Sequence, residues 1–148
     1  MRIIIISILV SGLTFAQGFL HNMNGEVVDG NGEPILLRGF GLGGWLVPEG
    51  YMLHNQAWIE GFESPTDIEN HVMDLIGQDA ATDFWNLYRA NYVAQADIDK
   101  IAEWGFNHIR VPFHYKQFYD STGTETPIGY GIVDELISWC EPHNIYII

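Results

Sequence analysis

The sequence predicts an α/β fold in which parallel strands alternate with helices, preceded by a β-hairpin. Apolar runs typical of strands occur at residues 35–40, 107–112 and 144–148, and amphipathic helical stretches separate them. Parallel strands need a long crossover between them, so strands separated by helices indicate βαβ units. No internal repeat or low-complexity linker interrupts the chain, and we therefore expect one domain over residues 18–148.

Residues 1–17 have the three-part form of a secretory signal peptide. Arg2 precedes an apolar run over residues 3–10, and a small-residue step predicts cleavage after Ala16 or Gln17. A membrane-spanning helix needs roughly 20 apolar residues, more than this run offers. We therefore expect a secreted protein, extracellular or periplasmic, with no membrane segment. The alternative is that this run forms a buried strand or helix.

The charge of the chain excludes some partners. Without the signal, 5 basic residues remain against 19 carboxylates, so 5 − 19 gives a formal charge of −14. A strongly acidic surface repels nucleic acid and anionic membranes but does not oppose a neutral polysaccharide. We therefore expect no nucleic-acid or membrane partner.

Cysteine usage and acidic spacing predict neither a disulfide nor a metal site. Cys140 is the only cysteine, and the histidines show no metal-ligand spacing. Asp29, Asn31 and Glu33 have the spacing of a calcium loop, but Pro34 stands where that loop requires glycine. A turn is therefore predicted there.

The first predicted elements are the hairpin and the strand that it leads into. Residues 26–28 and 35–37 flank Asp-Gly and Asn-Gly dipeptides at 29–32, which favour tight turns. The first strand of the sheet is then predicted over residues 35–40. A long aromatic-rich loop follows, through Phe62.

Three helices are predicted between the first two strands. The first runs over 64–76, with Ser64 as N-cap and Asp67 at the capping-box position. The second runs over 79–92, and the third, 97–104, ends at a glycine.

A second strand is predicted over 107–112, where the terminal proline cannot donate to a ladder. A further helix over 132–140 should face inward through Val133, Leu136, Ile137 and Cys140, and it leads to the last strand, 144–148.

Two motifs carry a resemblance to a known family. The first is Gly43-Gly44-Trp45, followed by Glu49 and Tyr51-Met52; the second is Gly105-Phe106-Asn107-His108-Ile109-Arg110-Val111-Pro112. Together they resemble the first two barrel strands of glycoside hydrolase family 5, the cellulase and β-glucanase family, particularly its exo-β-glucanase-like members. The resemblance implies a (β/α)8 TIM barrel, of which residues 18–148 would form the N-terminal portion, about three βα units, truncated in strand 3.

The resemblance also implies roles for two charged residues. Arg110 would lie beneath the nucleophilic glutamate and keep that carboxylate ionised and oriented, a supporting catalytic role. The alternative is a structural ion pair in the barrel interior. Glu49 would bond sugar hydroxyls, and the alternative is an ordinary solvated carboxylate.

Aromatic residues near these strand ends are the other candidates for substrate binding. Trp45, Tyr51, His114 and Tyr115 are residue types that contact sugars, through ring faces or hydrogen bonds. For Trp45 and Tyr51 the alternative is a role as core anchors. His108 is expected to be a core histidine, and it can point inward beside Arg110 if the two share a face.

The sequence lacks the motif that would carry a catalytic glutamate of this family. The resemblance implies retaining hydrolysis of β-glucan or cellulose, without cofactor, by glutamates on strands 4 and 7, the first within Asn-Glu-Pro. The chain contains no Asn-Glu-Pro, so both catalytic glutamates are expected to be absent and the chain alone inactive. The alternatives are a non-catalytic carbohydrate-binding protein or pseudoenzyme, and an unrelated (β/α)8 enzyme for phosphorylated metabolites, which the acidity disfavours.

Overall fold

The computed structural model describes residues 18–53 and 64–148 of the chain. The chain divides into two compact units, Met1–Leu36 and Leu37–Ile148. The predicted signal peptide, residues 1–17, lies outside the described residues, as do residues 54–63 of the predicted aromatic-rich loop.

The first unit contains a short antiparallel hairpin. Strand β1, His21–Met23, pairs with β2, Glu26–Val28. The two-residue turn between them is Asn24-Gly25, with φ angles of 54° and 90°. Positive φ at both positions is the geometry that favours Asn-Gly in tight hairpin turns.

The predicted hairpin between residues 26–28 and 35–37 forms only at its turn end. There an isolated antiparallel bridge joins Val28 and Pro34. It is flanked by hydrogen bonds from Ile35 N–H to the Val27 carbonyl at 3.1 Å and from Asp29 N–H to the Glu33 carbonyl at 2.9 Å. The strand ladder of this unit is instead the one between β1 and β2.

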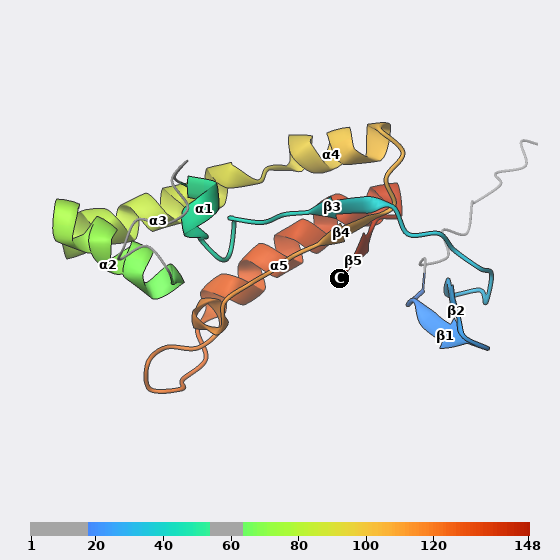
Figure 1. Ribbon diagram of the computed structural model, residues 1–148, viewed down its shortest axis with the longest axis horizontal. Coiled ribbons are helices and arrows are strands. Elements are labelled where there is room, and N and C mark those ends of the chain that lie inside the picture. Colours follow the sequence, from blue (N-terminus) through green and yellow to red (C-terminus); the bar gives the residue numbers. More distant parts are fainter. Residues whose placement is uncertain (1–17, 54–63) are drawn as a thin grey trace, which may run out of the picture. The chain divides into compact units, whose positions relative to one another are not determined.

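The second unit contains an open sheet of three parallel strands in the order β3-β4-β5 (Figure 1). They are β3, Gly39–Gly41; β4, His108–Arg110; and β5, Tyr146–Ile147. Gly41 is in register with Arg110. The three predicted strands are present but shorter. The described residues form two βαβ crossovers and no closed barrel, so they do not show the predicted three complete βα units.

Helices form both crossovers. The first contains α1, Gly50–Leu53; α2, Pro65–Ile76; α3, Gln78–Tyr92; and α4, Gln95–Glu103. The second contains the 3₁₀ turn η1, Tyr115–Gln117; α5, Pro127–Cys140; and the 3₁₀ turn η2, Glu141–His143. None of the helices in the described ranges is long and apolar enough to cross a membrane.

The capping box predicted for α2 is confirmed. The Ser64 hydroxyl accepts a hydrogen bond of 3.2 Å from Asp67 N–H, and the Asp67 carboxylate accepts one of 3.1 Å from Ser64 N–H. The Ser64 hydroxyl also donates to that carboxylate at 2.7 Å, which lowers the Asp67 pKa.

Helix α5 begins five residues earlier than predicted. Thr126 is its N-cap and Pro127 occupies the first turn, where a missing N–H has no cost. This first turn contains Gly129 and Gly131, and the low helix propensity of glycine explains why the sequence pattern did not predict it. Leu136 and Cys140 are buried as predicted, but Ile137 is exposed, which corrects that assignment.

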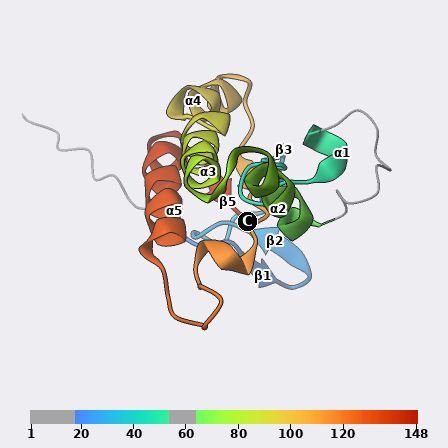
Figure 2. The same ribbon diagram turned by 90° about the vertical axis from the view of Figure 1, so that its left-hand side faces the viewer.

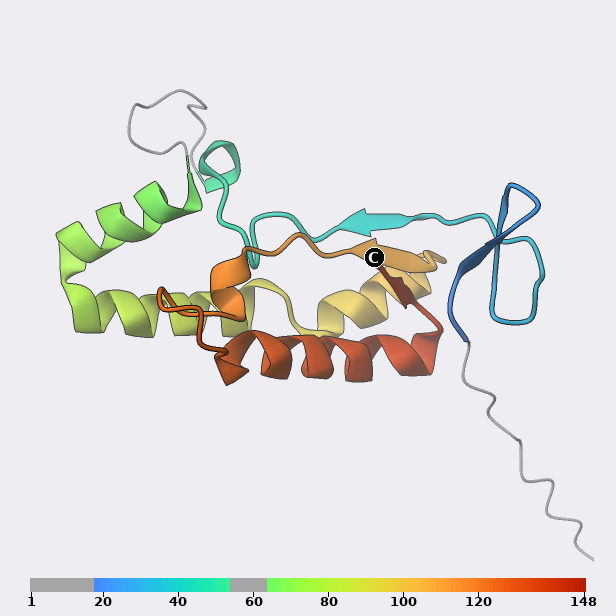
Figure 3. The same ribbon diagram turned by 90° about the horizontal axis from the view of Figure 1, so that it is seen from below.

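Helices α4 and α5 lie on the same side of the sheet. Figures 2 and 3 show them beside each other there. The core lies between them and the sheet, and its fully buried members are Leu46, Ile98, Ile109, Leu136 and Cys140. Because Ile109 of β4 faces this core, its neighbours in the strand face the opposite side.

Candidate functional site

The candidate site lies at the carboxyl ends of β3 and β4, where two loops run side by side. The Leu42 N–H donates a hydrogen bond of 2.8 Å to the Arg110 carbonyl, just beyond the end of β3. Further along, Leu46 and Phe113 form a parallel bridge, and His114 N–H reaches the Leu46 carbonyl at 3.3 Å. Backbone pairing therefore fixes the two loops against each other at one edge of the sheet.

The glycine bend after β3 packs against α3. Gly44 has a φ of 78°, and a Cβ atom there would lie 2.7 Å from the Tyr92 hydroxyl. The Tyr88 hydroxyl donates a hydrogen bond of 2.7 Å to the Gly44 carbonyl. Burial, with a smaller contribution from Tyr92, raises the pKa of Tyr88 to about 12. Only glycine combines this backbone angle with this close approach.

Trp45 belongs to the core at this edge. Its side chain is 2% exposed, and its indole N–H donates a hydrogen bond of 2.8 Å to the Arg89 carbonyl. This is the core-anchor alternative that the sequence left open. We therefore assign Trp45 no substrate contact at the carboxyl ends of the strands.

Glu49 and Tyr51 follow the bend. Glu49 is half-buried, and one carboxylate oxygen lies 3.4 Å from the position of a Cβ atom built on Gly43. In the described part of the chain, this carboxylate has no ion-pair partner within 4 Å. Tyr51, on α1, is 62% exposed and so is not a core anchor. Both side chains are available to a ligand.

Arg110 ends β4 on the sheet face that points away from the helices. It is exposed, whereas its neighbour Ile109 is 0% exposed in the core on the other face. No carboxylate among residues 18–53 and 64–148 lies within ion-pair distance of its guanidinium. The alternative role for Arg110, a structural ion pair, is therefore not formed in this part of the chain.

His108 lies on the same sheet face as Arg110, because the two are two positions apart in β4. Its Nδ1 atom is buried and has no hydrogen-bond partner among the residues that the structure describes. A Cβ atom on Gly39 would collide with the His108 carbonyl oxygen and lie 2.6 Å from this nitrogen, so the glycine makes room for both the backbone and the ring of His108.

His114 and Tyr115 stand together at the start of η1. Their ring centroids are 4.5 Å apart, and Nδ1 of His114 accepts a hydrogen bond of 3.3 Å from Lys116 N–H. Tyr115 is 61% exposed. The pair thus presents an aromatic surface next to the loop that carries Glu49.

The sequence analysis missed two residues that hold this surface in place. Lys116 Nζ donates hydrogen bonds to the Thr66 hydroxyl at 2.8 Å and to the Glu69 carboxylate at 3.3 Å, which ties η1 to α2. Gln117 is buried, and its amide reaches the Leu46 carbonyl at 3.5 Å. No sequence pattern marks either residue, since their partners lie 47 to 71 positions away.

The residue types on β4 and the two paired loops suit a polyhydroxylated ligand. Arg110 and Glu49 supply a hydrogen-bond donor and an acceptor, and Tyr51 and Tyr115 supply aromatic rings. Retaining glycoside hydrolysis requires two carboxyl groups about 5 to 5.5 Å apart, and the predicted site residues include one. No group of three or more possible metal ligands occurs among the residues described.

Comparisons with known proteins identify relatives of the chain. The family model described as Cellulase (glycosyl hydrolase family 5) matches residues 63–148. A β-xylosidase of Phanerodontia chrysosporium is 30% identical over 126 residues, which cover 83% of this chain and 25% of the relative.

Two further relatives are, by name, a glucan glucosidase and an endoglucanase. Glucan 1,3-beta-glucosidase 1 of Schizosaccharomyces pombe is 26% identical over 91% of this chain and 33% of its own length. Endoglucanase C of Acetivibrio thermocellus is 32% identical over 38% of this chain and 17% of its own length. The chain thus spans between about one sixth and one third of the length of these relatives.

Proposed function

Because this chain belongs to glycosyl hydrolase family 5, the cellulase family, we propose that it forms the N-terminal part of the (β/α)8 catalytic domain of a retaining β-glucan hydrolase. The observation that carries this proposal is the pairing of the two loops after β3 and β4. It supports the proposal because Arg110 ends β4 and the two paired loops carry Glu49 and the His114–Tyr115 pair, beyond the carboxyl ends of parallel strands. Active sites of (β/α)8 enzymes lie at that edge.

The proposed substrate is a β-glucan or cellulose. Support comes from the names of the relatives, two of which are glucan 1,3-beta-glucosidase 1 and endoglucanase C. A neutral polysaccharide is also compatible with the formal charge of −13 of the whole chain, which opposes binding of nucleic acid. The proposed reaction needs no cofactor.

Arg110 has a supporting catalytic role in this proposal, and the other residues bind sugar. A guanidinium on the inner sheet face would hold the nucleophilic carboxylate ionised and oriented. Glu49 would accept hydrogen bonds from sugar hydroxyls, and Tyr51, His114 and Tyr115 would contact the ring faces.

We further propose that both catalytic glutamates lie outside these 148 residues and that the protein is secreted. A complete (β/α)8 barrel takes about 250 residues, and the chain contains no Asn-Glu-Pro. The apolar run after Arg2 supports a secretory signal.

Reducing-sugar release from β-glucan and from carboxymethyl-cellulose tests these proposals. The whole protein should release sugar, and the 148-residue chain should release none. In the whole protein, Arg110→Lys should lower kcat by at least about tenfold while the melting temperature changes little, because lysine keeps the charge and loses the planar fork.

Arg38→Lys is the matched control, since Arg38 is exposed and precedes β3 at the opposite end of the strands. Equal effects of the two substitutions would contradict the role of Arg110. Sugar release by the 148-residue chain would refute the proposal that the catalytic glutamates lie outside it.

The second candidate function is non-catalytic binding of the same polysaccharide. The single carboxylate among the predicted site residues favours it. A protein of this kind would be retained by immobilised β-glucan without releasing sugar, whereas the enzyme would do both.

A further inference from the structure

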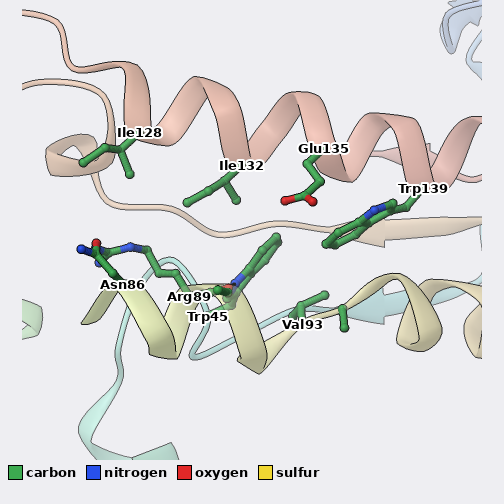
Figure 4. Close-up of a pocket in the computed structure, with 10 residues that line it drawn as sticks. Trp45, Asn86, Arg89, Val93, Ile128, Ile132, Glu135 and Trp139 are labelled. Carbon is green, nitrogen blue, oxygen red and sulfur yellow. Dashed lines mark hydrogen bonds between the residues drawn. The ribbon is translucent and has the colours of Figure 1, made fainter. Parts of the chain in front are cut away.

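A cavity of about 340 Å³ opens between α3 and α5, on the helix side of the sheet (Figure 4). Arg110 points away from that side, so the cavity is separate from the candidate site. Its volume is at the small end of the range for ligand pockets. The residues that give it chemical character are Trp45, Asn86, Arg89, Ile132, Glu135 and Trp139.

Two tryptophans line this cavity. Trp45 and Trp139 both point into the gap between the helices, from the loop after β3 and from α5 (Figure 4). Trp45 is 2% exposed and its indole N–H is bonded to the Arg89 carbonyl, so it forms part of the packed wall. Trp139 is half-buried and packs on the edge of the core, which leaves part of its ring accessible. The Trp139 ring suits the C–H face of a pyranose.

Donors and an acceptor lie on opposite walls. On α3, the Arg89 guanidinium donates a hydrogen bond of 2.8 Å to the Asn86 side chain, which orients both groups at the cavity. On α5, the Glu135 carboxylate has no hydrogen-bond or ion-pair partner in the described part of the chain. The two formal charges cancel, which favours a neutral ligand whose hydroxyls can both donate and accept.

We propose that this cavity is a second carbohydrate site, which binds one or two pyranose units of a neutral β-gluco-oligosaccharide. The choice of glucose as the sugar rests on the proposed function; the cavity itself indicates a neutral, polyhydroxylated ligand with an apolar ring face. Glu135 accepts hydroxyl hydrogen bonds, Arg89 and Asn86 donate them, and Trp139 stacks on the sugar. A phosphorylated ligand is disfavoured, because Glu135 would repel it.

Titration of the whole ¹⁵N-labelled protein with cellotetraose and laminaritetraose tests this assignment. The Trp139 indole N–H resonance, assigned with a Trp139→Phe variant, should shift saturably. Glu135→Ala should weaken binding, measured at that resonance, by about tenfold, the loss expected for a charge-assisted hydrogen bond. Asp134→Ala is the matched control, since Asp134 is the preceding, exposed carboxylate on α5 and does not line the cavity; it should leave binding unchanged.

The outcomes separate this site from the proposed function. An unmoved Trp139 resonance, or equal affinity in the Glu135→Ala variant, overturns the second site even if the protein hydrolyses β-glucan. A Trp139 shift that depends on Glu135 supports the second site even if the protein releases no sugar. Binding of glucose 6-phosphate in preference to both oligosaccharides at the same resonance would also overturn it.

Discussion

The indole N–H of Trp45 donates a hydrogen bond of 2.8 Å to the carbonyl oxygen of Arg89, 44 residues further along the chain. Arg89 lies in the last turn of α3, where carbonyl groups lack partners within the helix. The bond therefore gives the Arg89 carbonyl a hydrogen-bond donor, and it holds the loop after β3 in the core. Both the candidate site and the cavity depend on this contact, because Glu49 follows in the same loop and Trp45 lines the cavity.

Replacing Trp45 should destabilise the protein strongly. Trp45→Ala should cost about 3 to 5 kcal/mol of unfolding free energy, as for other buried aromatic residues. Trp45→Phe should cost about 1 to 3 kcal/mol, because it leaves the Arg89 carbonyl without its donor. Thermal and urea unfolding provide the measurement. The control is Trp104→Phe, at a side chain that is 58% exposed; an equal loss there would contradict the prediction.

Two glycines of α5 should respond oppositely to alanine. A Cβ atom on Gly129 would lie 2.4 Å from the Gln117 carbonyl oxygen, whereas one on Gly131 has nothing within 4 Å. Gly129→Ala should therefore lose about 1 to 3 kcal/mol through overpacking. Gly131→Ala should gain about 0.5 to 1 kcal/mol through helix propensity. Urea unfolding of the two variants compares them directly, and a stable Gly129→Ala variant would show that α5 does not approach η1 this closely.

Tyr88 should make the protein less stable at alkaline pH. Its pKa is raised from 10.0 to about 12, chiefly by burial. Between these values the unfolded state loses the phenol proton and the folded state keeps it, so the free energy of unfolding falls as pH rises from about 10 to 12. Unfolding at a series of pH values should show a smaller decline for Tyr88→Phe than for the unchanged protein. Parallel declines would contradict the prediction.

Cys140 should be unreactive in the folded protein. It is 1% exposed, and burial raises the pKa of its thiol from 9.0 to about 11. A pKa higher by two units leaves about a hundredfold less thiolate at neutral pH. Burial also keeps the reagent from reaching the sulfur. Labelling with Ellman's reagent should therefore be at least about a hundredfold slower in buffer than in 6 M guanidinium chloride. Rapid labelling of the folded chain would mean that α5 opens locally.

Local signals predicted most of the secondary structure. The capping box of Ser64 and Asp67 predicted the start of α2, and the glycine after residue 104 predicted the end of α4, whose last residue is Glu103. The strand at 107–112 was visible as an apolar run that ends at a proline. These features depend on neighbours within about four residues, so the sequence contains them directly.

The hairpin and the start of α5 were mispredicted because two local signals competed. Asn24-Gly25 and the Asp29–Gly32 turn both offer positive φ values, and the shorter turn forms the ladder. Gly129 and Gly131 suggested a loop, but both lie within α5, where Gly129 approaches the Gln117 carbonyl of η1 closely. Such a close approach between distant segments cannot be seen in the local sequence.

The sequence by itself determined the family, through two motifs at strand ends, and the order of strands and helices. Only the tertiary structure decided that Trp45 lies in the core, that Arg110 points away from the helices, and that Lys116 ties η1 to α2. It alone showed the cavity between α3 and α5. The physical reason is that burial and hydrogen-bond partners of these side chains come from segments tens of residues away, and no local pattern specifies which distant group will meet them.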